Sequence, residues 1–145
     1  MKRTFVIVAS RFNGPYVDGL IDHTRNELAF LAPGATISLH RVPGAFEIPI
    51  VVQEIAAKRE AAAIIALGVI FKGKTSHAEN LARSVTNALQ QIALEHSVPV
   101  LHAVLSLENE TEARERCLEN EINRGVEAAR AAVAMADTMA TLRRA

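Results

Sequence analysis

The chain has 145 residues, enough for one domain that buries about 70% of the surface exposed by its unfolded form. We therefore predict a single domain spanning residues 1–145. Sixteen basic and sixteen acidic residues cancel and leave no basic stripe, which argues against a nucleic-acid or anionic-membrane partner.

The number of cysteines, the spacing of the histidines and the length of the apolar runs argue against further classes of protein. The only cysteine, Cys117, excludes an internal disulfide and a cysteine-cluster metal site, and it suits a reducing compartment, so we expect a cytoplasmic protein. The five histidines are scattered singly, so we expect no metal. The uncharged run Ala61–Phe71 is far shorter than the ~20 residues of a membrane span.

The first half of the chain predicts two strand–helix units. Thr4–Ala9 is a short, β-branched-rich run typical of a strand, and a helix with an apolar face every three or four residues follows from Pro15. Thr36–Arg41 alternates like a strand. Pro43 and Gly44 then break the chain before an apolar helix over Ile48–Lys58.

The second half predicts two more strands and further helices. Ala62–Ile70 is apolar without alternation, as expected of a strand covered on both faces, and a helical stripe continues to Glu95. Val98–Leu107 is the fourth strand. The remainder, Thr111–Leu142, is helical with an interruption near Asn123–Gly125. This order predicts an α/β fold, a three-layer α/β/α sandwich around a four-stranded parallel sheet.

In such sheets, ligands bind outside the carboxyl ends of the strands, where the strand order reverses. The loops at these ends are Ser10–Gly14, Val42–Glu47, Gly68–Ser76 and Leu105–Asn109. We therefore expect one edge of the sheet to carry Phe12, Glu47, Lys74, Thr75 and His77.

The segment Gly68–His77 matches the phosphate-loop pattern G-x-x-x-x-G-K-[ST], which raises the possibility of a nucleotide-binding protein. Three of the four intervening residues are Val69, Ile70 and Phe71, which indicate a strand and not a flexible loop. We therefore predict a smaller anion site over Gly73–Thr75, between a strand and a helix, where unpaired N–H groups attract phosphate.

Four features each have a functional and a plain structural interpretation. Phe12, in a polar turn, can stack on a flat heterocycle or pack on the first helix. The segment Val42–Pro49, stiffened by two prolines, can present Ala45 and Glu47 to a ligand or simply begin a helix. His77 can be an inert helix residue, but imidazole, with an ordinary pKa of about 6.5, suits proton transfer. Arg116 lies in a charged run typical of a solvated helix face.

The chain carries a set of motifs in a fixed order: Arg11-Phe12-Asn13, Val42 to Pro49, Leu67 to Ile70 with Gly73-x-Thr75-x-His77, Asn109 to Ala113 before Arg116, and Asn123-Arg124-Gly125. In these motifs, and over nearly its whole length, it closely resembles the lumazine synthase family. The resemblance implies a flavodoxin-like fold and a transferase of riboflavin biosynthesis. The reaction would condense 5-amino-6-(D-ribitylamino)uracil with 3,4-dihydroxy-2-butanone 4-phosphate and release phosphate and water, without a cofactor.

The resemblance also implies roles for the substrate-binding residues. Phe12 would stack on the pyrimidine ring, Ala45 and Glu47 would hold the ribityl chain, and Phe46 would also bind substrate. The pyrimidine edge would meet backbone groups of Val69–Phe71.

Lys74, Thr75 and Arg116 would bind the phosphate, and His77 would be the catalytic group that moves protons. In this family the active site lies between subunits of a homo-oligomer, a pentamer or larger.

Two positions depart from the family pattern. His102 stands where an interfacial phenylalanine is common, so its contact with substrate is open. A lysine often present near the last helix is replaced by Arg124 or Asn120, depending on the alignment.

Two alternatives from other classes stay open: a P-loop nucleotide-binding protein, and a non-catalytic flavin- or lumazine-binding shell protein of the same fold. The first should also show an acidic residue for magnesium at a strand end, and none is evident. The presence of His77 and Arg116 argues against the second.

Overall fold

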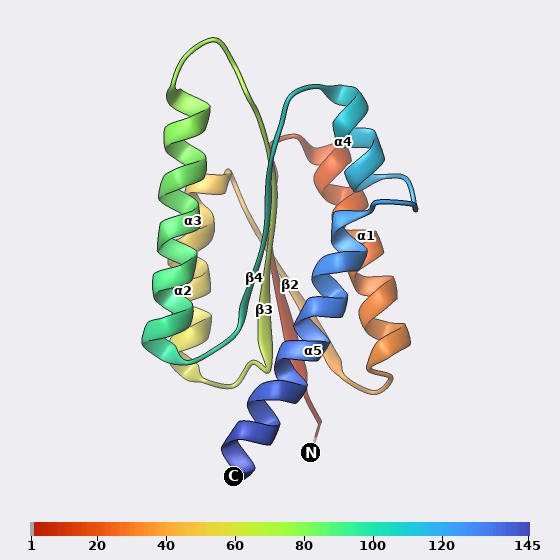
Figure 1. The fold of residues 1–145 in the computed structure, drawn as a ribbon, viewed down its shortest axis with the longest axis vertical. Helices are drawn as coiled ribbons and strands as arrows, with labels where there is room; N and C mark the ends of the chain where they lie inside the picture. The colour runs from red at the N-terminus through yellow and green to blue at the C-terminus, as the bar shows by residue number, and fades with distance from the viewer. Residues whose placement is uncertain (1) are drawn as a thin grey trace.

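The computed structural model describes residues 2–145, and its centre is a parallel β-sheet (Figure 1). The strands are β1 (Thr4–Ser10), β2 (Thr36–Val42), β3 (Ala63–Phe71) and β4 (Val100–Leu107). They lie in the order β2-β1-β3-β4. This is the beginning of the flavodoxin-like order 2-1-3-4-5, with the reversal between β1 and β3.

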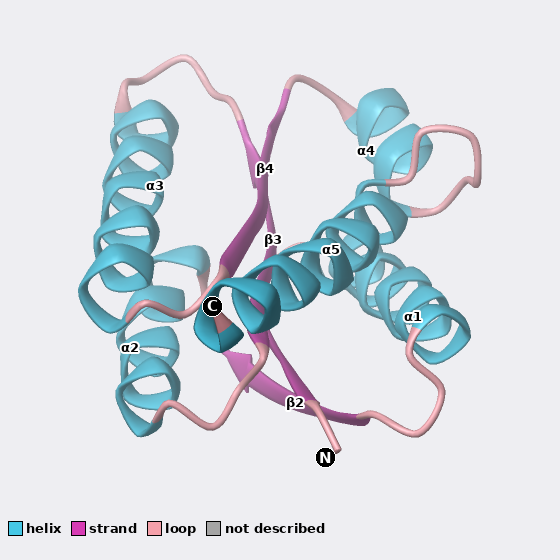
Figure 2. Ribbon diagram, turned by 60° about the horizontal axis from the view of Figure 1, so that its bottom comes forward, coloured by secondary structure: helices cyan, strands magenta, loops and turns pink. Residues whose placement is uncertain are grey.

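Helices cover both faces of the sheet, as Figures 1 and 2 show. One face carries α1 (Gly14–Leu31), α4 (Glu110–Cys117) and α5 (Arg124–Arg144), and the other carries α2 (Ile48–Lys58) and α3 (His77–His96). A single 3-10 turn, η1 (Ala45–Glu47), precedes α2. The predicted three-layer α/β/α sandwich is confirmed.

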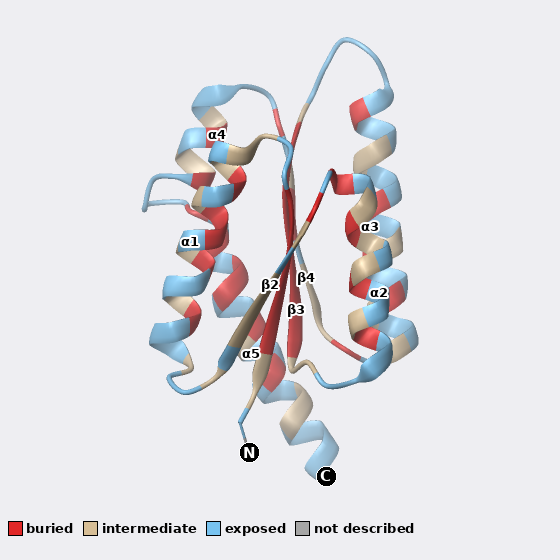
Figure 3. Cartoon of the chain, turned by 180° about the vertical axis from the view of Figure 1, so that it is seen from behind, coloured by how far each residue is buried: buried red, intermediate tan, exposed pale blue. Residues whose placement is uncertain are grey.

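Strand β3 is buried on both faces, which explains its continuous apolar sequence. Ile65, Leu67 and Val69 belong to the cluster under α1 and α5, whereas Ile64 and Ile70 belong to the cluster under α2 and α3. Figure 3 shows this strand as the buried centre of the molecule, flanked by helices whose outer faces are exposed. The core therefore has two halves separated by one sheet.

The loop after β3 is shorter than the sequence predicted. Gly68 lies inside β3, in register with Val104, and the strand continues to Phe71 before the loop begins at Lys72. A Cβ atom at Gly68 would lie 3.1 Å from Ser10 Oγ and 3.3 Å from Val104 Cγ1. This glycine therefore serves close packing within the sheet, and the loop predicted from Gly68 was wrong for that reason.

A similar correction applies to β4. Leu105, Ser106 and Leu107 pair with β3, so the loop predicted from Leu105 begins only at Glu108. The strand starts at Val100, two residues later than predicted. Proline at position 99 has no N–H to donate, which suits a position just before the strand.

The loops after β3 and β4 lie at the end of the molecule opposite to both chain termini (Figure 1). This is the carboxyl end of the parallel sheet, where the sequence placed the site. Within residues 2–145, no helix combines the length and the hydrophobicity that a membrane span requires.

Candidate active site

A cavity of ≈ 650 Å³ opens at the carboxyl end of the sheet, between the β1–α1 loop, η1 and the first turns of α3. It brings together four residues that the sequence predicted for substrate binding and the predicted catalytic histidine. Its lining consists of Phe12, Gly44, Ala45, Phe46, Glu47, His77, Asn80, Leu81 and Ser84.

Two aromatic rings at this cavity are unusually exposed. Phe12 is 69% exposed and Phe46 is 66% exposed, so neither ring is a core residue. The position of Phe12 depends on Gly44, because a Cβ atom there would lie 2.9 Å from Phe12 Cδ2. An exposed aromatic face beside a cavity can stack on a flat ligand.

The η1 turn holds Glu47 in a fixed place. Its Oε1 accepts a hydrogen bond from the backbone N–H of Gly44 at 2.9 Å, and its own N–H donates to Gly44 O at 3.2 Å. The helix α2 then begins at Ile48, with Pro49 in its first turn. One carboxylate oxygen of Glu47 thus orders the loop, while the residue still lines the cavity.

His77 is the first residue of α3, where the helix dipole is positive. Its backbone N–H lies 3.4 Å from Thr75 Oγ1. Lys74, Thr75 and His77 are all exposed in this segment. The N-terminal turn of a 20-residue helix with adjacent cationic and hydroxyl side chains suits an anion.

Thr75 lines a second, smaller cavity of ≈ 290 Å³ together with Lys72, Gly73 and Ser106. Lys72 Nζ donates to Glu108 Oε1 at 3.0 Å, and this hydrogen bond raises the pKa of Lys72 above its ordinary value. The pair ties the loop after β3 to the loop after β4. No residue of this cavity also lines the Phe12 cavity.

Arg116 and His102 lie in a third place, a cleft of ≈ 390 Å³ at the outer edge of β4. Arg116 projects from α4, and its Nη1 is buried without a hydrogen-bond partner among residues 2–145. A buried guanidinium nitrogen without an acceptor is costly, and an anionic ligand would relieve that cost. This cleft shares Ser106 with the Thr75 cavity and no residue with the Phe12 cavity.

His102 is held by two hydrogen bonds. Its Nδ1 accepts from the backbone N–H of Val104 at 3.1 Å, and its Nε2 lies 2.7 Å from Thr86 Oγ1 on α3. Because the accepting Nδ1 is unprotonated, the ring is neutral and donates through Nε2. Burial lowers the pKa of His102. Although much of the residue is exposed, both of its nitrogens bond to protein groups.

Val69, Ile70 and Phe71 do not line the Phe12 cavity with their side chains. Val69 O accepts a hydrogen bond from Asn13 Nδ2 at 2.7 Å, and the ring of Phe71 packs edge-on against Tyr16 at a centroid distance of 5.8 Å. The backbone role predicted for this segment stays a prediction.

Sequence reasoning missed four residues of this region. Asn13, in the left-handed conformation at φ 60°, joins the ends of β1 and β3 through its bond to Val69 O. Asn80, Leu81 and Ser84 line the cavity from α3. They follow His77 at helical spacing, so the periodicity of α3 could have identified them.

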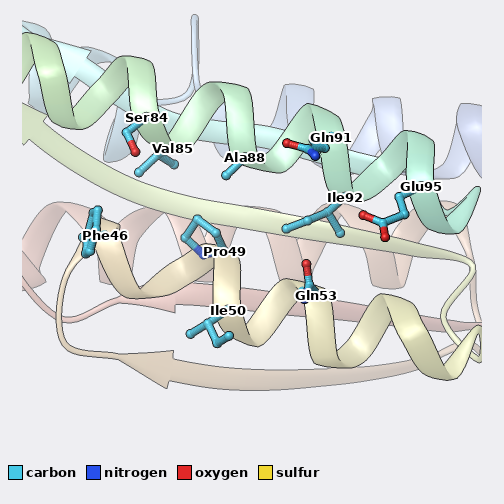
Figure 4. A pocket seen from close by; sticks show the side chains of 10 residues that line it. All are labelled: Phe46, Pro49, Ile50, Gln53, Ser84, Val85, Ala88, Gln91, Ile92 and Glu95. Atoms are coloured by element: carbon cyan, nitrogen blue, oxygen red, sulfur yellow. The ribbon is translucent and has the colours of Figure 1, made fainter.

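A groove between α2 and α3 adjoins this cavity (Figure 4). It has a volume of ≈ 390 Å³ and shares Phe46 and Ser84 with the cavity. Ile50, on its α2 side, is 62% exposed. An apolar surface therefore runs from the Phe12 cavity along α2.

A family model and individual relatives identify the same family of proteins. The sequence model of one family, described as 6,7-dimethyl-8-ribityllumazine synthase, matches residues 2–140. A protein of that name from Halorhodospira halophila is 40% identical over 139 residues, which cover 95% of this chain and 89% of the relative. Another from Xanthomonas campestris is 39% identical over 139 residues, 95% of this chain and 90% of the relative.

Among solved structures, a de novo designed Rossmann fold protein aligns over 78% of this chain and 91% of its own. The TM-score is 0.38 and the identity is 22%. This similarity is too low to bear on function.

Proposed function

The chain belongs to the 6,7-dimethyl-8-ribityllumazine synthase family, and we propose that it makes this lumazine as a transferase of riboflavin biosynthesis. Its substrates are 5-amino-6-(D-ribitylamino)uracil and 3,4-dihydroxy-2-butanone 4-phosphate. The observation that carries the proposal is the cavity that joins the exposed ring of Phe12 to Glu47 and His77.

The Phe12 cavity binds the pyrimidine substrate. The ring of Phe12 stacks on the pyrimidine, and the η1 residues Ala45, Phe46 and Glu47 contact the ribityl chain. A carboxylate and backbone groups held by a rigid turn suit a polyhydroxylated chain, because they accept and donate hydrogen bonds at fixed positions. Backbone groups of Val69–Phe71 meet the pyrimidine edge.

Lys74, Thr75 and Arg116 bind the phosphate, and His77 transfers protons. The aromatic amine attacks the ketone to form an imine with loss of one water, and elimination of phosphate then gives an enol that tautomerises to a new ketone. The ribitylamino nitrogen closes the ring on that ketone with loss of a second water. Each step moves a proton at nitrogen, carbon or oxygen, which is the work of a general acid and base near neutral pH. No cofactor takes part.

The active site forms between neighbouring copies of the chain. Arg116 lies in the cleft at β4, which shares no residue with the cavity of His77. A second copy that docks its β4 edge on the Phe12 cavity brings the two together. The apolar surface along α2, with Ile50 and Phe46 exposed, is available for that contact. We therefore propose a homo-oligomer, a pentamer or larger.

A direct assay tests this function. The purified protein, mixed with the two substrates and without metal or nucleotide, should produce lumazine absorbance and fluorescence together with inorganic phosphate. ATP and GTP should bind no more tightly than inorganic phosphate. Tight, magnesium-dependent binding of GTP in calorimetry would instead support the phosphate-loop alternative, although the position of Gly68 inside β3 argues against it.

A further inference from the structure

Arg41 lies at the carboxyl end of β2, next to the candidate site, and its guanidinium bridges two elements. Nη2 donates to the backbone O of Ser10 at 2.9 Å, and Nη1 donates to Asp18 Oδ1 on α1 at 3.1 Å. The side chain is only 21% exposed, and its Nε is buried without a partner among residues 2–145.

The position of Ser10 explains why a side chain is needed there. Strand β1 pairs with β3 only as far as Ala9, whereas its pairing with β2 continues to Ser10 and Val42. The chain therefore leaves the sheet at Ser10, at the point where the strand order reverses. Arg41 gives the last carbonyl of β1 a cationic donor, which forms a stronger hydrogen bond than a neutral one.

Backbone hydrogen bonds attach the two residues after Ser10 to the end of β2 and the residue that follows it. The N–H of Arg11 donates to Val42 O at 2.8 Å, and the N–H of Phe12 donates to Pro43 O at 3.1 Å. The ring of Phe12 then lies against Gly44. The segment Ser10–Phe12 thus runs beside the segment Val42–Gly44. The side chain of Arg41 adds a hydrogen bond at the first residue of this contact, Ser10.

We propose that Arg41 is a positioning residue for the pyrimidine substrate, acting through Phe12. By holding Ser10 against the end of β2, it fixes the segment Ser10–Phe12 and with it the plane of the Phe12 ring. This inference rests on the proposed function, since it assumes that Phe12 stacks on the substrate. Arg41 itself lines none of the four hollows described above, the Phe12 cavity, the Thr75 cavity, the cleft at β4 and the groove between α2 and α3.

The ion pair with Asp18 does not account for this arrangement. Asp18 is 61% exposed, and exposed pairs contribute little to stability. Burial of Nε without a partner opposes folding. The bond of Arg41 to Ser10 O, at 2.9 Å, is the shorter of its two hydrogen bonds, and its effect falls on the loop that follows.

Three variants separate positioning from stability. Arg41→Met keeps the aliphatic stem and removes every donor, Arg41→Lys keeps one cationic donor, and Asp18→Asn removes the ion pair while leaving the bond to Ser10. A matched control, Arg3→Met, removes another arginine–carboxylate pair, at 2.6 Å to Asp137 on α5. The measurements are kcat, KM for each substrate and the melting temperature.

Arg41→Met should raise KM for the pyrimidine substrate about two- to tenfold, the cost of ordering one mobile side chain, Phe12, when the substrate binds. KM for the butanone phosphate should be nearly unchanged. Arg41→Lys should reverse part of the increase for the pyrimidine substrate. Asp18→Asn and Arg3→Met should keep both KM values. If Arg41→Met only lowers the melting temperature and leaves both KM values unchanged, the residue is structural and the inference is wrong.

A double-mutant cycle tests the route through Phe12. If Arg41 acts through that ring, Arg41→Met should add little to the KM increase that Phe12→Ala causes alone. Additive effects would contradict the inference. Should Arg41→Met not fold, Arg41→Lys takes its place in the cycle. Absence of lumazine from the wild-type chain would instead refute the proposed function, so the two failures are distinguishable.

Discussion

His77 occupies the position where one residue can serve both substrates. It begins α3, lines the Phe12 cavity and lies two residues after Thr75, the end of the proposed anion site. His77→Ala should lower kcat by roughly 10- to 10⁴-fold, the range for loss of a general acid or base. KM should change less, because the contacts that bind substrate remain. Steady-state kinetics with both substrates measures this, and a raised KM at unchanged kcat would contradict the catalytic role.

Arg116 is predicted to act on binding. Its buried, unpartnered Nη1 suits an anion, and a charge-assisted contact is worth ~1.5 to 3 kcal/mol. Arg116→Ala should raise KM for the butanone phosphate about tenfold or more and spare KM for the pyrimidine substrate. Arg130→Ala is a suitable control, since it removes an exposed cation of α5 that pairs with Glu27 of α1. An unchanged KM in Arg116→Ala would show that the phosphate assignment is wrong.

His102 makes stability depend on pH. Burial holds its pKa below the ordinary 6.5, so between the two values the unfolded chain binds a proton that the folded chain does not. The free energy of unfolding therefore falls as pH drops below 6.5. Protonation of Nδ1 would also release the N–H of Val104. His102→Phe lacks this contribution. As pH falls from 7.5 to 5.5, the wild type should therefore lose stability relative to the variant, as measured by urea denaturation.

The sequence predicted the site residues whose positions follow from nearby parts of the chain. Phe12, Glu47 and His77 follow strand ends by a few residues, so chain order alone placed them at one edge of the sheet. It could not place Asn13 on Val69 O, which lies 56 residues away, because that bond depends on how β1 and β3 pair. The separation of Arg116 from the Phe12 cavity agrees with the resemblance, which implies an active site between subunits, but chain order alone does not indicate it.

Among the elements, α5 depends on one buried cap. Asn123 is 2% exposed, its Oδ1 accepts from the N–H groups of Gly125 and Val126, and its Nδ2 donates to Glu119 O. Asn123→Ala should lower the free energy of unfolding by about 1 to 3 kcal/mol. Asn123→Asp keeps the acceptor and should cost less. Denaturation at a fixed protein concentration measures the free energy of unfolding of both variants. Equal losses would contradict a stabilising role of the hydrogen bonds that Asn123 Oδ1 accepts.

The elements themselves were largely predictable. Apolar periodicity identified four strands and the helices between them, with bounds within two residues at most positions. The exceptions have physical causes. The strand predicted over Ala62–Ile70 and the loop predicted over Gly68–Ser76 overlapped from Gly68 onward. The structure places this glycine in β3, where the missing side chain gives room to Ser10 and Val104. The apolar run predicted the end of β4 at Leu107 correctly, and pairing with Leu107 carries β3 one residue beyond the predicted Ile70, to Phe71.

For the whole molecule, we expect assembly. A four-stranded sheet has two outer edges, on β2 and β4, and such edges expose backbone groups unless they are covered. Five copies of a 15.7 kDa chain have a mass of about 79 kDa, the smallest that we expect from light scattering during chromatography. A monomer of about 16 kDa that still makes lumazine would refute the site between subunits.

Mixed variants test the shared site more directly. Equal amounts of His77→Ala and Arg116→Ala, dissociated and reassembled together, should place a native His77 beside a neighbour's native Arg116 at about a quarter of the sites, as random mixing in a cyclic oligomer predicts. At a butanone phosphate concentration well below KM, where both variants are impaired, the mixture should therefore be more active than the mean of its two components. If the mixture is no more active than that mean, both residues act within one chain.

The two chain ends and the candidate site lie at opposite ends of the sheet (Figure 1). An affinity tag, a fluorescent protein or a surface anchor joined to either terminus would therefore project away from the mouth of the Phe12 cavity. Immobilised chains should keep that cavity open to solution, which makes attachment through a terminus the suitable geometry for surface-based measurements of substrate binding.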